Sequence, residues 1–375
     1  MVTARSAGSF DPYSAMACPS GLEGHVQRQE IDQSLDHECL SAGADRVIAR
    51  SFRSSDMGKV KIAVLSFLIA SGIPLAAQRI ETVPFGDFER WTTRHIKESA
   101  IIGGEVKTIY VLGPQETIDG NKPYDYSKTL WASSNAYAKV SGVTKTSLSA
   151  EPDNGPSGKC AKLSTVYASC KVAGLVDIQV LATGALYWGK MFEPITGVKN
   201  PYANMDWGIP FTKRPKAVII DYKAFLPATG KLVKGTTFRK TEIPGEDPCQ
   251  VMLLLQKRWE DENGNIHALR VGTAFLRIGS STSDWVQNKR IPVMYGDARE
   301  VPGYKSYMSL ISGENTLYAA NSRGKLVPIR EEGWASSKEE CTHAVLQISS
   351  GSRGGFTGAL GNTLWVDNLR LEYER

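Results

Sequence analysis

The sequence predicts an all-β protein, built as a large antiparallel β-sandwich or jelly roll. From residue 79 onward, runs of β-branched and aromatic residues alternate with clusters of Gly, Pro, Asn and Asp. No long stretch keeps the 3.6-residue period of an amphipathic helix, and the alternation of strands and helices that a parallel sheet requires is missing. Many short strands separated by turn residues are typical of sandwiches and jelly rolls.

The clearest strands surround a hairpin signal. Val251–Trp259 and Ile266–Ile278 flank Asn263-Gly264, two residues that tolerate the positive φ of a type I′ turn. Lys216–Phe225 has an apolar centre, which indicates burial on both faces. Three further ranges have strand composition: Asp177–Tyr187, Ala344–Ser349 and Thr363–Tyr373.

Residues 57–78 have the composition of a secretory signal peptide. Met57 starts a short basic stretch, which is followed by the apolar run Ile62–Leu75 and by Ala76-Ala77-Gln78. The run is shorter than the roughly 20 residues that a membrane-spanning helix needs, and a buried helix of the fold is the alternative. Residues 1–56 keep no strand or helix period and are predicted to be a miscalled start or a non-structural extension. We therefore expect an exported protein (periplasmic, cell-surface or extracellular) whose β domain spans residues 79–375.

Charge and hydropathy exclude two classes of partner. The chain carries 44 Lys and Arg against 39 Asp and Glu, and these are scattered without a basic block, which argues against nucleic acid. After residue 78 no apolar stretch is long enough to span a membrane.

Four cysteines follow residue 78: Cys160, Cys170, Cys249 and Cys341. None forms a CxxC pair, so a zinc site is not predicted. A hairpin through 166–168 would bring Cys160 opposite Cys170 and allow a disulfide in an oxidising compartment. Buried free thiols are the alternative, and the pairing stays open.

One carboxylate falls among apolar residues of the last predicted strand. Strand alternation places Asp367 in the row of Trp365 and Leu369, and a buried carboxylate must be paired, hydrogen-bonded or bound to metal. Asp87 and Glu89 lie near the start of the β domain, and the first and last strands of jelly rolls often lie close together. Asp87, Glu89 and Asp367 therefore predict a structural Ca²⁺ site. The alternatives are that Asp367 caps a backbone turn, pairs with an Arg, or is turned outward by a bulge.

Aromatic residues beside polar ones mark two stretches where a sugar could bind. Sugar rings offer an apolar face and a rim of hydroxyls, so their sites combine Trp or Tyr with Asp, Asn, Gln or Arg. Packing of long loops onto the sandwich is the competing role for these aromatics, and Trp259, Trp285 and Trp365 are assigned to packing. The carbohydrate-binding candidates are Tyr124 and Trp131 in 122–137, and Trp188, Tyr202 and Trp207 in 187–207.

A glycoside hydrolase would need two carboxyl groups on either side of the scissile bond. Glu193 and Asp206 share the aromatic-rich stretch 187–207 and are the candidate catalytic pair for that case. The few His residues stand in no HExxH or GxSxG context, so metalloprotease and serine-hydrolase chemistry are unsupported.

Several separate motifs occur in the order found in one known family. They are Phe88-Glu-Arg-Trp91, Gly113-Pro114, Trp131-Ala-Ser-Ser-Asn135, Gly208-Ile-Pro-Phe-Thr-Lys-Arg-Pro215, Tyr295-Gly-Asp297, Asn321-Ser322 and Leu364-Trp-Val-Asp-Asn368. With these motifs the chain resembles the PCMD family, the "putative carbohydrate metabolism domain" of secreted bacterial proteins, from about Phe85 to Tyr373. The resemblance implies a large jelly-roll sandwich similar to carbohydrate-binding modules, in bacteria that harvest polysaccharides; it implies no catalytic residues.

The predicted function is binding of a polysaccharide or oligosaccharide by loop aromatics, without turnover. A glycoside hydrolase is the first alternative. A structural or adhesive cell-surface sandwich that binds protein is the second, because a fold alone does not separate these roles.

Overall fold

A computed structural model describes residues 79–374, apart from 174–175, 198–199, 201 and 237–238. The predicted extension and signal peptide, residues 1–78, lie outside the described residues. The regular structure of the described residues consists of strands and five short 3-10 turns, which confirms the all-β prediction. A helix long and apolar enough to cross a membrane is not found there. The 3-10 turns are η1 (Ala100–Ile102), η2 (Tyr126–Lys128), η3 (Ala298–Glu300), η4 (Ser306–Met308) and η5 (Gly313–Asn315).

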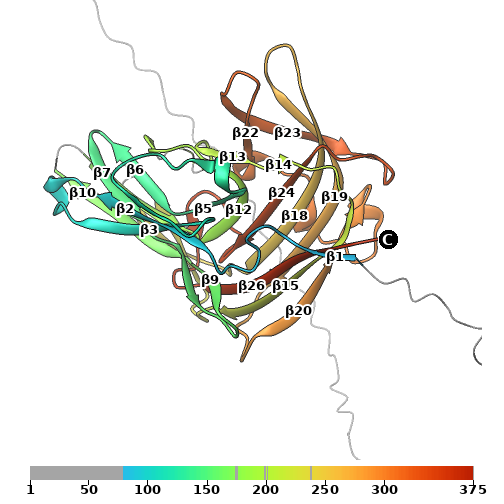
Figure 1. Cartoon of the computed structure of the whole chain (residues 1–375), viewed down its shortest axis with the longest axis horizontal. Helices are drawn as coiled ribbons and strands as arrows, with labels where there is room; N and C mark the ends of the chain where they lie inside the picture. Colours follow the sequence, from blue (N-terminus) through green and yellow to red (C-terminus); the bar gives the residue numbers. More distant parts are fainter. Residues whose placement is uncertain (1–78, 174–175, 198–199, 201, 237–238, 375) are drawn as a thin grey trace, which may run out of the picture. The chain divides into compact units, whose positions relative to one another are not determined.

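Two large sheets make the sandwich (Figure 1). The six-stranded sheet runs in the order β20-β15-β26-β9-β8, with β1 added to β26. Its strands are β1 (Arg79–Thr82), β8 (Ala150–Asn154), β9 (Lys159–Ser164), β15 (Pro215–Phe225), β20 (Val286–Pro292) and β26 (Thr363–Tyr373). The first and last strands of the domain are thus neighbours, as jelly-roll strands are expected to be.

The ten-stranded sheet runs in the order β13-β12-β24-β18-β19-β23-β22, and β5, β14 and β21 pair with its members. All of its pairs are antiparallel except β19 with β23. Its strands are β5 (Trp131–Ser133), β12 (Ala185–Met191), β13 (Met205–Trp207), β14 (Ile209–Pro210), β18 (Cys249–Glu260), β19 (Ile266–Ile278), β21 (Met294–Tyr295), β22 (Tyr318–Ala320), β23 (Leu326–Trp334) and β24 (His343–Ser349).

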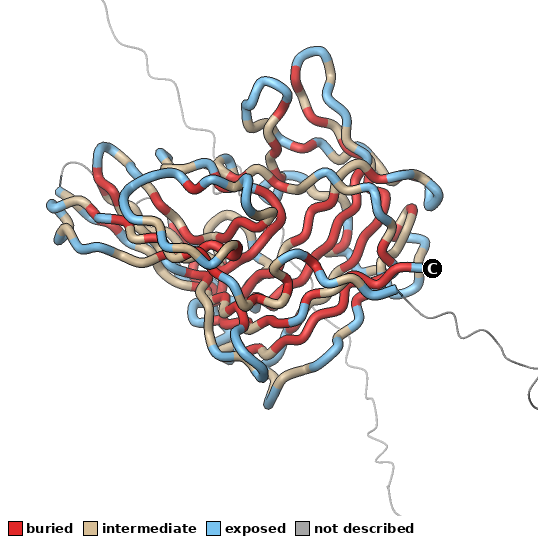
Figure 2. Tube along the Cα trace, viewed as in Figure 1, coloured by how far each residue is buried: buried red, intermediate tan, exposed pale blue. Residues whose placement is uncertain are grey.

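The main core lies between these two sheets. Val218 and Val366 of the six-stranded sheet and Leu253 and Leu346 of the ten-stranded sheet are buried in one apolar cluster, and Figure 2 shows the buried residues following these strands. Because side chains alternate along a strand, the neighbours of Leu253, Met252 and Leu254, point to the opposite face. They belong to a second apolar cluster, so the ten-stranded sheet is covered on both faces.

Two smaller three-stranded sheets and two hairpins complete the domain (Figure 1). The three-stranded sheets have the orders β3-β2-β4 and β17-β16-β25. Their strands are β2 (Trp91–Lys97), β3 (Val106–Leu112), β4 (Thr117–Asp119), β16 (Lys231–Thr236), β17 (Arg239–Pro244) and β25 (Thr357–Gly358). The hairpins are β6 (Ala136–Val140) with β7 (Val143–Ser147), and β10 (Val166–Val172) with β11 (Val176–Ala182).

The β18–β19 hairpin is confirmed, but the type I′ turn is wrong. Gly264 has φ +83°, whereas Asn263 keeps a negative φ. The connection is a longer loop that Asp261 organises, because its carboxylate accepts hydrogen bonds from the backbone N–H groups of Asn263 and Asn265. Asp261 therefore replaces the two-residue turn by an Asx-type loop.

The expected single strand Asp177–Tyr187 is also wrong, because the chain breaks it at Gly184 into β11 and β12. A Cβ at Gly184 would lie 2.3 Å from the Ser164 N and 2.4 Å from the Ser149 O. Only glycine fits this close crossing of backbones, and the crossing carries the chain from the small hairpin into the ten-stranded sheet.

The weakly favoured Cys160–Cys170 disulfide is not formed. All four described cysteines are free and buried. Cys160 lies in β9 and Cys170 in β10, and burial raises the thiol pKa of both. The free-thiol alternative is the correct one for this structure.

Candidate functional site: a cavity on the second face of the ten-stranded sheet

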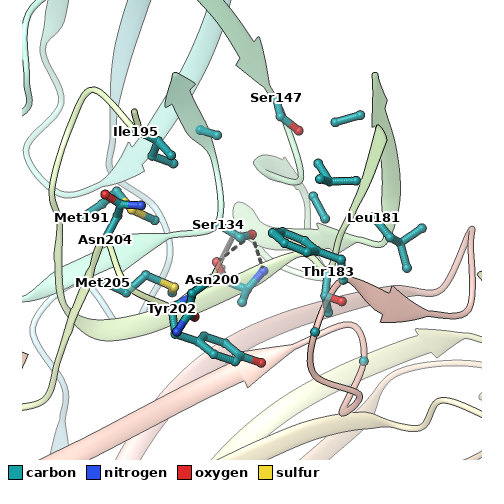
Figure 3. A pocket seen from close by; sticks show the side chains of 18 of the residues that line it. Ser134, Ser147, Leu181, Thr183, Met191, Ile195, Asn200, Tyr202, Asn204 and Met205 are labelled. Carbon is teal, nitrogen blue, oxygen red and sulfur yellow. Dashed lines mark hydrogen bonds between the residues drawn. The ribbon is translucent and has the colours of Figure 1, made fainter. Parts of the chain in front are cut away.

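A cavity of about 300 Å³, here called the sheet cavity, lies on the face of the ten-stranded sheet that points away from the main core. Strands β18, β19 and β24 supply its floor, and Asn200, Tyr202 and Asn204 supply its rim together with residues from 311–317 and 351–356. The hairpins β6–β7 and β10–β11 line its other end. In Figure 3, Met191, Ile195 and Met205 lie on one side of the cavity and Leu181 on the other.

Three polar side chains from adjacent strands meet on the floor. Gln250 of β18 lies opposite Arg277 of β19, and Gln347 of β24 lies opposite Met252 of β18. Strand alternation explains why they share this face, because their chain neighbours Val251, Ile278 and Leu346 belong to the main core. Gln250, Arg277 and Gln347 all line the cavity, and we call them the polar stripe.

Arg277 is held by two neighbours but keeps hydrogen-bonding capacity. Its Nε donates to the Gln250 Oε1 at 3.3 Å, and its guanidinium lies 4.1 Å from the centre of the Tyr307 ring. The two terminal nitrogens have no protein partner among the described residues. Burial lowers the pKa of the guanidinium, which still leaves it charged at neutral pH. A fixed cation with two free nitrogens therefore faces the cavity.

Tyr202 is positioned at the rim by an asparagine. The Asn200 Oδ1 accepts from the Tyr202 backbone N–H at 2.9 Å, and the Asn200 Nδ2 donates to the Tyr318 hydroxyl at 2.8 Å. The Tyr202 ring packs edge-on against Trp207 with 6.3 Å between centroids. Burial raises the pKa of Tyr202 to about 12, so its hydroxyl stays protonated and able to donate.

A second rim loop, residues 351–359, is clamped by one buried carboxylate. The Asp247 Oδ1 accepts from the backbone N–H groups of Ser352 at 2.7 Å and Arg353 at 3.1 Å, and its Oδ2 accepts from Ala359 at 3.2 Å. A Cβ at Gly351 would lie 2.2 Å from this Oδ2. Burial raises the pKa of Asp247, although the three backbone donors oppose that effect. Asp247 thereby places Ser352 and Arg353 at the cavity.

Two buried polar atoms beside the cavity have no hydrogen-bond partner in the described structure. They are the Trp207 Nε1 and the Ser352 Oγ, and both residues line the cavity. A buried donor without a partner costs about 1–3 kcal/mol, so such groups normally meet a ligand or water. The site is thus rich in donors that an oxygen-bearing ligand would satisfy.

The described lining residues of the sheet cavity include no Asp or Glu. Its charged lining residues are Lys145, Arg277 and Arg353, and its aromatic ones are Tyr202, Trp207, Phe275, Tyr307 and Phe356. Acid–base cleavage of a glycosidic bond uses a pair of carboxyl groups, which this lining does not supply. The arrangement suits binding of a polyhydroxylated ligand.

The predicted aromatic residues separate into two groups. Tyr202 and Trp207 line the sheet cavity, but Trp207 is itself 0% exposed in the second apolar cluster, and only Tyr202 is partly exposed. Trp131 and Trp188 are 0% and 2% exposed in the main core, and the Trp131 Nε1 donates to the Pro84 carbonyl. Tyr124 is buried, with its hydroxyl 3.3 Å from the Thr92 Oγ1. The expectation that Tyr124, Trp131 and Trp188 offer ring faces to a sugar is therefore corrected, since packing covers these rings.

Trp259, assigned to packing, packs on the surface of the sheet with 41% of it exposed. It lies across the hairpin from His267, and the two rings stack at 5.4 Å with an angle of 13°.

The predicted catalytic pair is not brought together in either cavity. The Glu193 carboxylate forms an ion pair with Arg94 at 2.8 Å, in which both side chains are almost fully buried, and it also accepts from the Tyr124 backbone N–H. Asp206 lines a second pocket of about 480 Å³ together with Arg258, Glu260 and His343, whereas Glu193 does not line it. Glu193 is thus occupied in a structural ion pair, which corrects its assignment as a catalytic residue.

The predicted metal ligands are neighbours but do not form a complete metal site. Burial raises the pKa of Asp367 to about 6, with smaller contributions from the Asp221, Glu89 and Asp87 charges. The Asp367 Oδ1 accepts from the Asn368 backbone N–H at 2.7 Å, and Asn368 has φ +52° where the β15–β26 register shifts. The capping alternative therefore describes Asp367; a bulge lies beside it but does not turn it outward, because Asp367 is 2% exposed. No group of three or more His, Cys, Asp or Glu in the described ranges is arranged to hold a metal ion.

Sequence reasoning missed the polar stripe. Gln250 and Gln347 adjoin apolar runs of their strands, and the argument applied to Asp367, that a polar residue among apolar ones needs a reason, would have marked them. Tyr307 lies in the 3-10 turn η4, Ser352 and Arg353 lie in a loop, and none of the three gives a comparable signal.

Comparisons with known proteins found similar solved structures and one matching family. Two solved structures, each described as a "putative glycoside hydrolase", are similar to the chain. The one from Bacteroides thetaiotaomicron is 20% identical, with a TM-score of 0.41, and the match covers 71% of this chain and 67% of that chain. The one from Bacteroides vulgatus is 15% identical, with a TM-score of 0.39, and the match covers 78% of this chain and 94% of that chain. A carbohydrate-binding module specific for non-crystalline cellulose has 9% identity, TM-score 0.24 and coverage of 64% and 87%. No curated protein matches the chain. The family described as "Putative carbohydrate metabolism domain" matches residues 113–372, most of the chain. The chain therefore belongs to this family, PCMD.

Proposed function

We propose that this protein is an exported glycan-binding protein that holds a polysaccharide or oligosaccharide in the sheet cavity without cleaving it. The observation that carries the proposal is the polar stripe, Gln250, Arg277 and Gln347, which lies among aromatic side chains in a cavity whose described lining lacks Asp and Glu. The carbohydrate-related family is consistent with it.

The physical argument rests on the two surfaces of a sugar. Aromatic rings such as Phe275 and Tyr307, 6.0 Å apart, offer apolar surface to the C–H faces. The free nitrogens of Arg277 and the amides of Gln250 and Gln347 offer hydrogen bonds to hydroxyl oxygens. The unpartnered Trp207 Nε1 and Ser352 Oγ add two donors whose burial cost a ligand would relieve.

One observation favours a hydrolase as the second candidate. The second pocket carries two carboxylates, Asp206 and Glu260, beside Arg258 and His343. Both carboxylates already accept backbone hydrogen bonds, Asp206 from Ala320 and Glu260 from Ser322. At least one oxygen of each carboxylate is therefore already occupied by a structural hydrogen bond.

The test is a panel of plant and host polysaccharides incubated with the purified chain. Affinity electrophoresis reports binding, and a reducing-sugar assay reports cleavage. Retardation without new reducing ends, weakened by Arg277→Met but not by Asp206→Asn, is the expected result. Release of sugar that Asp206→Asn or Glu260→Gln abolishes would establish the hydrolase instead. If the protein shows neither binding nor cleavage, the structural, protein-binding role is favoured instead.

Export is part of the proposal and has a separate test. Mass spectrometry of the protein from the cell envelope and medium should find a mature N-terminus close to Arg79. Peptides from residues 27–46 in that material would contradict the predicted start at Met57.

A further inference from the structure

The sheet cavity continues into a second lobe that the polar stripe does not explain. This lobe lies between the hairpins β6–β7 and β10–β11, and residues of all four strands line it. Most of these side chains are small and apolar. The apolar members are Ala136, Ala138, Val140, Val143, Ala168, Cys170, Val176, Ile178 and Val180; we call this region the apolar lobe.

The far end of the lobe is closed by contact between the hairpins. Val143 of β7 packs with Cys170 of β10 and Val176 of β11 in a small buried cluster. Ala138 and Val180, by contrast, are only half-buried, although both line the cavity. Apolar surface left partly uncovered inside a concave site marks a place where a ligand is held.

No unpaired charge faces this apolar surface among the described residues. Lys145 is the one charged lining residue of the two hairpins, and its Nζ pairs with the Glu98 carboxylate at 3.1 Å. Glu98 also accepts from the Thr146 backbone N–H and hydroxyl. The lobe is therefore electrostatically neutral and suits a hydrocarbon group.

We infer that the ligand of the sheet cavity is an amphiphilic glycan, whose sugar lies on the polar stripe and whose alkyl or acyl substituent lies in the apolar lobe. This inference rests on the proposed function and adds the class of glycan. The cavity volume of about 300 Å³ corresponds to roughly ten water molecules at about 30 Å³ each. It therefore has room for a sugar ring and a short chain.

Titration calorimetry with methyl, butyl and hexyl β-D-glucosides, kept below their micelle concentrations, tests the inference. Burial of a methylene is worth about 0.8 kcal/mol, which is about fourfold in affinity. We expect hexyl glucoside to bind more tightly than methyl glucoside by about fourfold for each methylene that enters the lobe. Equal affinities, or no binding of hexyl glucoside, would overturn the inference.

Two variants locate the effect. Ala138→Phe fills the lobe with a ring and should remove the gain from methyl to hexyl. Val180→Thr keeps the side-chain shape, adds a hydroxyl and should weaken hexyl binding several-fold with methyl binding unchanged. Val106→Thr is the matched control, because Val106 is 61% exposed and does not line the cavity. A hexyl gain that survives both lobe variants would contradict the assigned position of the chain.

The outcomes separate the inference from the proposed function. If polysaccharide binding depends on Arg277 but longer alkyl chains bind no more tightly, glycan binding is supported and the amphiphilic ligand is contradicted. The opposite outcome is that affinity rises with alkyl chain length and Ala138→Phe removes this rise, while polysaccharide does not bind and Arg277→Met has no effect. That outcome would support an apolar ligand and contradict a glycan ligand. Arms with acetylated and long-chain acylated glycans then distinguish a decorated polysaccharide from a lipid-linked one.

Discussion

Gln250 and Arg277 lie directly opposite each other across the β18–β19 pair, and a hydrogen bond of 3.3 Å joins the Arg277 Nε to the Gln250 Oε1. The bond uses the inner nitrogen of the guanidinium and leaves the two outer ones free. A cross-strand pair on a rigid sheet thus fixes a cation at the floor of the cavity, at little entropic cost on binding.

Replacement of Arg277 by Met should weaken glycan binding by about ten- to a hundredfold. The charged hydrogen bonds lost are worth about 1.5–3 kcal/mol; the apolar stem of the side chain is largely kept, and the cation–π contact of the guanidinium with Tyr307 is lost with the charge. Affinity electrophoresis and calorimetry measure the change. Arg299→Met is the control, since Arg299 is exposed and pairs locally with Asp297. Equal losses in both variants would indicate a general charge effect.

The buried pair Arg94–Glu193 predicts a structural phenotype. Glu193→Gln leaves the buried Arg94 charge without its counterion, and breaking such a pair costs about 3–5 kcal/mol. Urea denaturation should show a lower midpoint with an unchanged m value. Glu105→Gln removes the carboxylate of an exposed pair with Lys107 and should leave the midpoint unchanged. Native stability in Glu193→Gln, together with loss of a hydrolytic activity, would restore Glu193 as a catalytic candidate.

Asp367 predicts that stability falls as the pH rises from about 4 to about 6. Its pKa is raised from an ordinary value of 3.8 to about 6 in the folded protein, so in this window the folded state binds more protons than the unfolded state, and deprotonation favours unfolding. Asp367→Asn is neutral throughout and keeps an acceptor for the Asn368 N–H. Its Tm should exceed that of the native protein at pH 7 and match it at pH 4.

Calcium would reverse that result. If Asp87, Glu89 and Asp367 bind Ca²⁺ with help from backbone oxygens, millimolar Ca²⁺ should raise the Tm of the native protein at pH 7 and EDTA should lower it. Asp367→Asn should then be insensitive to Ca²⁺ and less stable than the native protein when Ca²⁺ is present. An identical Tm in EDTA and in Ca²⁺ would remove the metal site.

The clamp made by Asp247 predicts a loss of order confined to one loop. Asp247→Ala removes the acceptor of three backbone N–H groups, those of Ser352, Arg353 and Ala359. Hydrogen exchange should become faster in 351–359, and glycan affinity should fall because Ser352 and Arg353 are no longer held at the cavity. Faster exchange across β18 and β24 as well would show global destabilisation instead.

Local sequence determined most of the strands. The alternation in Val251–Trp259 and Ile266–Ile278 and the turn residues between them predict the β18–β19 hairpin, because strand period and turn chemistry act over a few residues. The family motifs between Phe85 and Tyr373 indicated the carbohydrate-related domain. The same local rules misjudged Gly184, since its need for glycine comes from Ser149 and Ser164, which approach it only in the folded chain.

The candidate site was decided by tertiary structure. Sequence composition singles out Trp131, Trp188 and Trp207 equally, and the fold buries all three, but only Trp207, in the second apolar cluster, borders the cavity. Gln250, Arg277 and Gln347 come from three strands, and only the register of β24, β18 and β19 brings them onto one face. Strand composition thus determined the fold class and the alternation of exposed and buried side chains along each strand. The pairing of strands distant in sequence, driven by burial of both sheets, decided which side chains meet and which of them a ligand can reach.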